Sequence, residues 1–392
     1  MGHVIQGINT RQMKILFIIY HGLSAESGVS KKILNQVTGF RELGHEVFLC
    51  CYNVDDKNQR LLTINRQIIH NFGSGRKGAL YKRFNYKKLA DFAINNKIDF
   101  VYTRSFHNAN PFTISLFKAF NKANIKSAIE IPTYPYDQEY KGFPLCTRIG
   151  IWIDKIYRKK LASLTNAIVT FTDDKIIFDQ KTIRISNGID FNYIPLMNKK
   201  SHNSDEIHFI GVAEVHYWHG YDRIIEGIGK YYEEKHTKDI YFHIVGGVGP
   251  SEMYNSIHAK GFHELIEKYN IEQHIIFHGQ KFGKDLDDIF DNADFAIGSL
   301  GRHRSGITNI KTLKNREYAA RGIPFIYSEI DSDFDNKPYI LKAKADDSYI
   351  DINTIIKFYK SNKNTPIEIR NSILNLSWKN QMKIVIKAIS EL

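Results

Sequence analysis

One short segment places an acidic side chain at the start of a predicted helix. The residues from Glu317 to Pro324 read EYAARGIP, and the apolar run Phe325–Tyr327 follows them. Glycine just beyond a helix end favours the left-handed cap and proline cannot continue the helix, so the segment predicts helix, tight turn and buried strand. A carboxylate at such a helix start can accept hydrogen bonds from a ribose diol, while backbone N–H groups and the helix dipole favour a diphosphate. Glu317 therefore indicates a nucleotide-sugar site. The alternative is a glutamate that only complements the helix dipole.

The composition is that of a globular protein with more than one core. The chain has 392 residues, of which 43% are hydrophobic and 24% are charged, and this length favours two domains. The three cysteines, Cys50, Cys51 and Cys146, have neither metal-ligand spacing nor the pattern of a disulfide framework, so they fit a reducing compartment. The segment from Met1 to Met13 is mixed and polar and lacks the features of a signal peptide. We therefore expect a cytoplasmic protein.

The charge balance predicts an anionic partner. The net charge is +12 and the isoelectric point is about 9.3, which fits nucleic acid, a membrane surface or a phosphorylated substrate. Two stretches, 76–88 and 148–160, combine basic residues with aromatic or apolar ones. Because this combination favours anionic lipid, we expect peripheral contact with the inner face of the cytoplasmic membrane; the alternative is two solvated helix faces. No nucleic-acid recognition motif is present, so no nucleic-acid partner is expected.

Apolar runs alternate with helical patterns along the chain. The first run, 14–20, is apolar throughout, as expected for a strand buried on both faces of a parallel sheet. A helix from about Lys31 to Leu43 and a second strand, 45–51, complete a βαβ unit, which predicts a doubly wound sheet. The other predicted strands are 99–103, 127–131, 167–171, 182–185, 207–212, 240–246, 275–279, 295–298 and 324–327.

The strand pattern stops at a polar segment, 198–204, and then restarts. This segment predicts a linker between two Rossmann-like domains, 1–197 and 205–375, with a terminal stretch, 376–392, that contains an amphipathic helix. In two such α/β halves that face each other across a cleft, ligands are expected at the carboxyl ends of the strands.

Several short motifs occur in an order that resembles one enzyme family. The tetrapeptide GHEV at 44–47 follows the first helix, SNGID at 186–190 precedes the linker, and ADF at 293–295 precedes Glu317 and its Gly-x-Pro stop. From Lys14 to the C-terminus this ordered set resembles the retaining GT-B glycosyltransferases of glycosyltransferase family 4. The resemblance implies two Rossmann-like domains, the first on the acceptor side and the second holding a UDP- or GDP-linked sugar donor. It also implies a last helix that crosses back to the N-terminal domain, and no metal or cofactor.

The resemblance assigns donor-binding roles in the second half of the chain. Glu317 matches the second glutamate of the family's Glu-x7-Glu motif, expected at the donor ribose. Asn309 stands where the first glutamate belongs, whereas counting forward from Ala293-Asp294 leads to His303; either residue can replace the glutamate, and we take Asn309 as a candidate catalytic residue. The basic residues around it are expected to stabilise the leaving diphosphate; they are Arg304, Lys311, Lys314 and Arg316.

A second departure from the family pattern follows the first strand of the second half. The family has an arginine in a Gly-Arg pair and then a Lys-Gly pair, but no arginine stands at the first place here, where the segment contains Glu214, and His219 occupies the lysine position. Arg223, one helical turn further, is a candidate to reach the diphosphate, and we expect the long basic loop, 301–311, to compensate; the alternative is altered donor binding. Ser27 and Gly28 stand where a glycine loop of the family approaches the donor phosphates.

Two residues of the first half are expected on the acceptor side. His107 follows a strand in a loop where the family often keeps a histidine, so it is a candidate for acceptor positioning or proton handling; the alternative is a loop histidine bonded to the backbone. Glu130 ends another strand before two prolines, in a loop expected to line the acceptor side. Both are candidate catalytic residues.

The resemblance implies transfer with retention, in which the leaving diphosphate can itself accept the acceptor proton. Similar enzymes build capsules and other surface polysaccharides, so we expect a glycan or lipid-linked glycan acceptor. The pattern Asp331-Ser332-Asp333 matches the Asp-x-Asp metal signature of the other glycosyltransferase fold, but we expect no metal there. Two alternatives keep the fold: a non-catalytic partner subunit that binds a nucleotide sugar, and a GT-B epimerase or phosphorylase.

Overall fold

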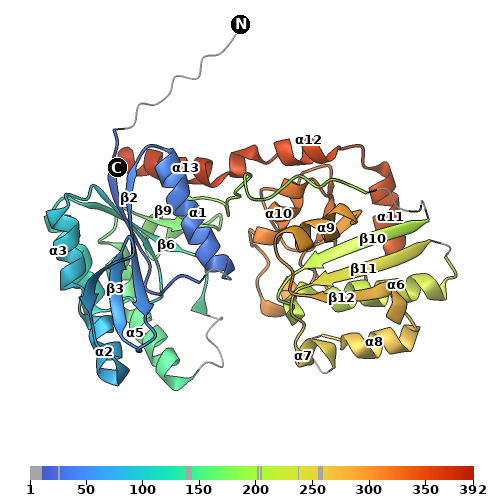
Figure 1. The fold of residues 1–392 in the computed structure, drawn as a ribbon, viewed down its shortest axis with the longest axis horizontal. Coiled ribbons are helices and arrows are strands. Elements are labelled where there is room, and N and C mark those ends of the chain that lie inside the picture. The colour runs from blue at the N-terminus through green and yellow to red at the C-terminus, as the bar shows by residue number, and fades with distance from the viewer. Residues whose placement is uncertain are drawn as a thin grey trace, which may run out of the picture. The chain divides into compact units, whose positions relative to one another are not determined.

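The computed structural model describes residues 11–24, 27–137, 144–200, 203, 205–236, 238–254 and 259–392. Most of the Met1–Met13 segment, part of the predicted linker and the side chain of Cys146 lie outside the described residues. The contacts divide the chain into two compact units. The first unit ends at Ser186 and also contains Trp378–Leu392, and the second is Asn187–Ser377. Figure 1 shows the helices and strands of both units.

The first unit is built on a nine-stranded sheet with the order β4-β3-β2-β1-β5-β6-β7-β9-β8. The strands from β2 to β9 in this order pair in parallel, and antiparallel pairing adds β3 and β4 at one edge and β8 at the other. The strands are β1 (Lys14–Ile18), β2 (Glu46–Val54), β3 (Arg60–Ile64), β4 (Gln67–Asn71), β5 (Phe100–Arg104), β6 (Lys126–Ile131), β7 (Ala167–Thr170), β8 (Ile176–Ile177) and β9 (Gln180–Arg184).

Strand β1 is apolar and buried from Ile15 to Ile18 because both faces of the sheet are covered. Ile15 and Phe17 point into the core cluster that includes residues of α1 and α13, whereas Leu16 and Ile18 point into the cluster formed with α3, α4 and α5, as the alternation of side chains along a strand requires. The helices of the first unit are α1 (Gly28–Glu42), α2 (Gly75–Phe84), α3 (Lys87–Asn95), α4 (Pro111–Lys122), α5 (Leu145–Ala162) and α13 (Trp378–Ser390).

The last helix of the chain, α13, belongs to the first unit. It packs along α1 (Figure 1) and buries Trp378, Met382 and Ile386 in the core there. The two helices approach so closely that a Cβ atom at Gly39 would lie 2.8 Å from the carbonyl oxygen of Trp378. Gly39 therefore lets α13 return to α1, as the expected crossing helix does.

The second unit has a fully parallel six-stranded sheet with the order β12-β11-β10-β13-β14-β15. With strands counted along the chain, this is the Rossmann order 3-2-1-4-5-6. The strands are β10 (Glu206–Val212), β11 (Asp239–Val245), β12 (Ile275–Gly279), β13 (Phe295–Ile297), β14 (Phe325–Tyr327) and β15 (Ile340–Lys342). The α-helices are α6 (Tyr221–Glu233), α7 (Pro250–Met253), α8 (Phe262–Tyr269), α9 (Lys284–Asp291), α10 (Leu313–Arg321), α11 (Ile352–Ser361) and α12 (Pro366–Asn371).

The α/β class with two parallel sheets is confirmed, but some details differ from the sequence analysis. The hairpin of β3 and β4 was not predicted, because its residues carry no strong alternation, and the two- and three-residue strands β8 and β15 were not predicted, because they are too short to show a pattern. The boundary between the units lies before Asn187 rather than at 198–204. The reason is that residues 187–197 pack on the second unit. The Met197 N–H donates a hydrogen bond to the Arg321 carbonyl oxygen at 2.9 Å, and Arg370 donates to the carbonyl oxygen of Ile194 at 2.9 Å.

Candidate functional site

The carboxyl edge of the second sheet has a topological switch point at β10. Its neighbours are β11 on one side and β13 on the other. The connection from β10 leads to β11 and that from β13 leads to β14, in opposite directions along the sheet, and ligands of such sheets bind at this point. The loops after β10 and β13 hold each other through main-chain hydrogen bonds from Leu300 to His219 at 2.9 Å and from Gly301 to Trp218 at 3.2 Å. Gly220 has φ 65° and no room for a Cβ atom, which would lie 2.6 Å from the Gly301 nitrogen.

Two buried charged groups near this edge have no hydrogen-bond partner among the described residues, although the Lys314 ammonium lies over the Tyr221 ring, 5.7 Å from its centroid. Lys314, the second residue of α10, has a buried ammonium nitrogen without a hydrogen bond. Glu329, two residues after β14, is 2% exposed, and neither of its carboxylate oxygens has a hydrogen bond. Buried polar groups are almost always satisfied, so such a pair marks a place where a ligand or water supplies the bonds.

The electrostatics of these groups show that they share one environment. Burial lowers the pKa of the Lys314 ammonium, Arg302 lowers it further, and Glu329 opposes the shift. Burial raises the pKa of the Glu329 carboxyl group, against the effects of Arg302 and Lys314. The pKa of His219 lies well below its usual value because of burial and of the same two cations. Lys314, Arg302, Glu329 and His219 therefore influence one another electrostatically, and we call these four residues the Lys314 cluster.

The first turn of α10 adds backbone donors beside the Lys314 cluster. Its N-cap residue, Thr312, makes no side-chain hydrogen bond to the first turn. The first N–H groups of a helix have no partners within the helix and carry partial positive charge. With Lys314 and Arg302, this helix start suits a diphosphate or a similar anion.

Glu317 lies one turn further along α10, which begins at Leu313, so the prediction that Glu317 opens the helix is wrong. Its Oε1 atom accepts hydrogen bonds from the Arg321 guanidinium at 3.0 Å, and its side chain remains 27% exposed. Arg321 is also bound to Asp287 at 2.7 Å. The carboxylate is thus held in place by Arg321 and remains partly exposed, and its contact with a ribose stays a prediction.

Two predicted diphosphate ligands, Arg316 and Arg304, are paired with protein carboxylates instead. Arg316 is completely buried and bonded to Asp331 and Asp333. Arg304 forms a bidentate pair with Asp222, with both distances 2.8 Å. The structure does not bring these guanidinium groups into the Lys314 cluster.

Arg223 is likewise occupied. Its Nε donates to the carbonyl oxygen of Ser348 at 2.6 Å, and its Nη1 donates to that of Leu300. It is 1% exposed and ties two loops together. Arg223 is therefore not available to a diphosphate, contrary to expectation, and Arg302, which the sequence analysis did not single out, is the arginine near His219 and Lys314.

The two aspartates of the Asp-x-Asp segment, 331–333, are paired with Arg316. Across the part of the chain that the structure describes, no group of three or more His, Cys, Asp or Glu side chains is arranged to hold a metal ion.

The two candidates for the missing motif glutamate lie in different surroundings. Asn309 is exposed and forms a β-bridge with Ile330, the residue after Glu329. His303 is close to Asp347, with Nε2 3.1 Å from its carboxylate. Lys311 is 8% exposed, and its carbonyl oxygen accepts a hydrogen bond from Asn187. Of these three residues, Asn309 is the one placed beside the Glu329 segment.

In the first unit, His107 follows β5, which pairs with β1 at the switch point of that sheet. Its backbone has φ 49°, and its ring stacks on Tyr136 with 3.7 Å between ring centroids. Burial lowers the pKa of His107 to about 4, and Arg104 adds to the shift. The imidazole is therefore neutral near pH 7 and is positioned by an aromatic neighbour.

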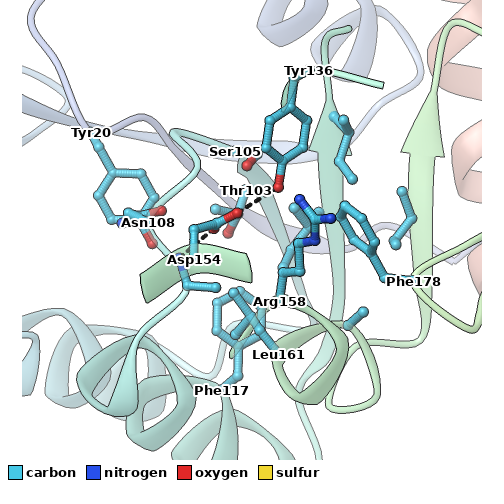
Figure 2. A pocket seen from close by; sticks show the side chains of 15 residues that line it. Tyr20, Thr103, Ser105, Asn108, Phe117, Tyr136, Asp154, Arg158, Leu161 and Phe178 are labelled. Atoms are coloured by element: carbon cyan, nitrogen blue, oxygen red, sulfur yellow. Dashed lines mark hydrogen bonds between the residues drawn. The ribbon is translucent and has the colours of Figure 1, made fainter. Parts of the chain in front are cut away.

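Asp154 on α5 holds Tyr136 and the loop after β5 in place through hydrogen bonds. Its carboxylate accepts hydrogen bonds from the Tyr136 hydroxyl at 2.6 Å and from the Ala109 N–H at 2.9 Å. Figure 2 shows Asp154 and Tyr136 in the wall of a cavity next to Arg158. The cavity has a volume of about 30 Å³, enough for a water molecule or two but not for a sugar. Sequence reasoning missed Tyr136 and Asp154, since neither carries a motif.

Glu130 lies at the centre of a buried network in the first unit. It is fully buried and accepts hydrogen bonds from Arg104 and Tyr102 at 2.5 Å each and from Gln36 at 2.5 Å. Burial raises the pKa of this carboxyl group, but Lys32 and Arg104 outweigh burial, so its pKa is lowered. Its oxygens are occupied by the protein, which points to a structural role.

Ser27 and Gly28 stand at the start of α1. The Ser27 hydroxyl caps the helix by accepting a hydrogen bond from the Ser30 N–H at 3.3 Å. Gly28 is exposed, and a Cβ atom there would have no neighbour within 4 Å. Packing within the protein therefore does not require glycine at this position.

Comparisons with known proteins agree on the fold. No family model matches the chain, and no curated protein matches its sequence. Among solved structures, the lipopolysaccharide outer core galactosyltransferase WaaB in its apo form has a TM-score of 0.60 at 13% identity, covering 97% of this chain and all of that one. The catalytic domain of starch synthase IV from Arabidopsis thaliana, bound to ADP and acarbose, has a TM-score of 0.58 at 11% identity, over 97% of this chain and 99% of that one. The pneumococcal O-GlcNAc transferase GtfA, in complex with UDP and GlcNAc, has a TM-score of 0.55 at 9% identity, over 97% and 99%. The chain has the GT-B fold of these glycosyltransferases.

Proposed function

We propose that the protein is a glycosyltransferase that moves a sugar from a nucleotide-sugar donor to a glycan or lipid-linked glycan. The donor is UDP- or GDP-linked, transfer proceeds with retention and without a metal, and the product belongs to a capsule or another surface polysaccharide. The chain is then a member of glycosyltransferase family 4. The GT-B fold supports the reaction class, and similar folds were solved with UDP or ADP bound.

The Lys314 cluster is the observation that carries this proposal. A buried ammonium group without a hydrogen-bond partner is costly, because burial removes its hydration without replacing it. The arrangement becomes favourable once an anion binds beside Lys314 and Arg302. A nucleoside diphosphate meets this requirement, and the cluster lies on the loops and helix start where such a fold holds its ligand.

Each residue then has a role in donor binding. Lys314 and Arg302 bind the diphosphate and stabilise the charge that develops as it leaves. Glu317 accepts hydrogen bonds from the ribose hydroxyls. Asn309 takes the place of the first motif glutamate at the sugar, which its bridge to Ile330 supports. His219 has its Nδ1 engaged by the His216 N–H at 3.0 Å and bonds a phosphate oxygen only through Nε2.

The acceptor side requires little acid–base chemistry from the protein. As the sugar–phosphate bond breaks, the departing diphosphate oxygen takes the proton of the attacking hydroxyl group. His107 then positions the acceptor rather than abstracting the proton, because its lowered pKa makes it a weak base. Glu130 stabilises the buried network of the first unit and has no direct role in the transfer reaction.

The experiment is a thermal-stability screen with UDP, GDP, ADP and CMP and their common sugars. A ligand that binds only the native state stabilises it by RT ln(1 + [L]/Kd), about 2.7 kcal/mol at a hundredfold excess over Kd. We expect stabilisation by one nucleoside diphosphate, little stabilisation of Lys314→Met, and normal stabilisation of the control Lys357→Met on the exposed face of α11. Absence of any shift in the native protein would refute a donor site.

Turnover of the identified donor separates the alternatives. Release of the nucleoside diphosphate with transfer to an acceptor supports the transferase. Conversion of the donor sugar without an acceptor would indicate an epimerase. Binding without any turnover would favour the non-catalytic subunit, an alternative that Asn309 and His219 keep open because neither is the usual family residue.

A further inference from the structure

Helix α5 presents a second apolar face to solvent. One face is buried in the core through Ile151 and Leu161. Large apolar side chains recur on another face at intervals of three and four residues, which places them in one line along the helix. This line, the α5 stripe, consists of Leu145, Ile149, Trp152 and Ile156, which are 68%, 50%, 64% and 53% exposed.

Basic side chains flank the α5 stripe. Arg148, Lys155, Lys159 and Lys160 are all exposed. Lys155 and Lys159 contact Asp137 at 3.4 Å and Asp179 at 2.9 Å, but such solvent-exposed pairs are weak and leave their cations available. The one acidic residue of α5, Asp154, is buried and faces inward.

Helix α2 continues this basic and apolar surface. The Arg83 guanidinium lies against α5, 2.9 Å from the place a Cβ atom at Gly150 would occupy. Phe84 packs on Phe112 with 4.7 Å between ring centroids. Leu80 is 60% exposed, and residues 75–88 contain six basic residues and no acidic one.

We propose that the α5 stripe and the adjoining surface of α2 dock the protein on an anionic lipid bilayer. The apolar side chains enter the headgroup region, Trp152 lies at the interface, and the flanking cations bind acidic headgroups. In the part of the chain that the structure describes, no helix is long and apolar enough to cross a membrane. The inference rests on the proposed function in one respect, since docking brings the enzyme to a lipid-linked acceptor.

Charge favours lipid over a second copy of the chain on this surface. In a symmetric dimer the same patch occupies both sides. The basic residues of α2 and α5 would then face their own copies, and like charges across an interface are unfavourable. Anionic headgroups complement both the charge and the apolar stripe.

The test is flotation of the full-length protein with vesicles. One set contains phosphatidylcholine alone, and the other contains phosphatidylcholine with about 30% phosphatidylglycerol, which gives the vesicles a negative surface potential. We expect binding to the anionic vesicles that weakens as salt rises, and about tenfold or greater loss of vesicle affinity in Ile149→Ser/Trp152→Ser/Ile156→Ser and in Arg148→Glu/Lys160→Glu. These residues are exposed, so the variants should fold. The matched control is Lys383→Glu/Ile384→Ser on the exposed face of α13, which should bind like the native chain.

Three outcomes would overturn the proposal. They are absence of binding to anionic vesicles, equal binding to both vesicle types, and unchanged binding of the α5 variants. Dissociation of a native dimer by the α5 variants would assign the stripe to a second copy instead. Nucleotide-induced stabilisation of the same variants, measured in parallel, distinguishes a failure of docking from a failure of the donor site.

Discussion

The guanidinium of Arg316 and the carboxylate of Asp331, both fully buried, form an ion pair with 2.6 Å between Nη1 and Oδ2. The pair joins α10 to the loop after β14. Arg316 also donates to the carbonyl oxygens of Thr312 at 2.9 Å and Asn187 at 3.1 Å. It therefore fixes the start of α10, and with it the position of Lys314, without being available to a ligand itself.

Removal of this arginine should destabilise the protein strongly. Arg316→Ala leaves Asp331 buried without its main partner, which costs about 3–5 kcal/mol when one member of a buried pair is lost. The free energy of unfolding from urea titration measures the effect. Lys357→Ala, an exposed lysine, should change the unfolding free energy by less than about 0.5 kcal/mol. An Arg316→Ala protein as stable as the native one would contradict the structural role.

Lys314→Met should raise the stability of the ligand-free protein while it weakens binding of the nucleoside diphosphate. The substitution removes a buried charge that has no hydrogen-bond partner among the described residues, so the ligand-free protein should gain about 1–3 kcal/mol. The same variant should lose most of its stabilisation by the nucleoside diphosphate. Unfolding titrations with and without the nucleotide measure both effects. Lower stability together with unchanged nucleotide binding would remove Lys314 from the site.

Glu317→Ala should weaken donor binding while leaving the fold intact. Arg321, the bonded neighbour of Glu317, keeps its contact with Asp287 at 2.7 Å in the variant. Loss of a charge-assisted bond to a ribose hydroxyl should reduce donor affinity by roughly tenfold or more. Calorimetric titration gives the dissociation constant, and an unchanged value would show that the carboxylate does not contact the donor.

Glu130→Gln should behave as a structural variant and not as a catalytic one. The carboxylate is paired with Arg104 at 2.5 Å and Lys32 at 3.9 Å, so loss of its charge should cost about 3–5 kcal/mol of stability. Donor-induced stabilisation should persist in the folded fraction. Full stability with abolished transfer would instead restore Glu130 to the catalytic residues.

Stability should fall with acidification partly through His107. Its folded-state pKa of about 4 lies below the unfolded value of about 6.5, so the unfolded chain binds the proton more readily. The contribution of His107 is complete above about pH 6.5 and is lost as the pH falls towards 4. His107→Gln should therefore flatten the decline in unfolding free energy between pH 6.5 and 4. An identical pH profile for native and variant proteins would show that the ring is not held neutral by its surroundings.

The sequence by itself determined the architecture of this protein. A strand buried on both faces must be apolar, as 15–20 is, and the restart of that pattern after residue 204 indicated a second α/β half. The Gly322-x-Pro324 stop placed Glu317 on α10, next to a buried strand, because glycine and proline act locally on the backbone. The amphipathic pattern after Trp378 marked the helix that returns to the first unit.

Only the tertiary structure decided which basic residues are available to a ligand. In the sequence, Arg304, Arg316 and Lys314 are equivalent cations of one basic segment. Their availability to a ligand differs because folding pairs some of them with carboxylates from elsewhere in the chain. Asp222 lies 82 residues from Arg304, and Asp331 lies 15 residues from Arg316. Lys314 has no such hydrogen-bonded partner among the described residues, and it influences the pKa of Glu329 instead. Local sequence fixes helices and strands, whereas the pairing of charges depends on which loops the folded sheet brings together.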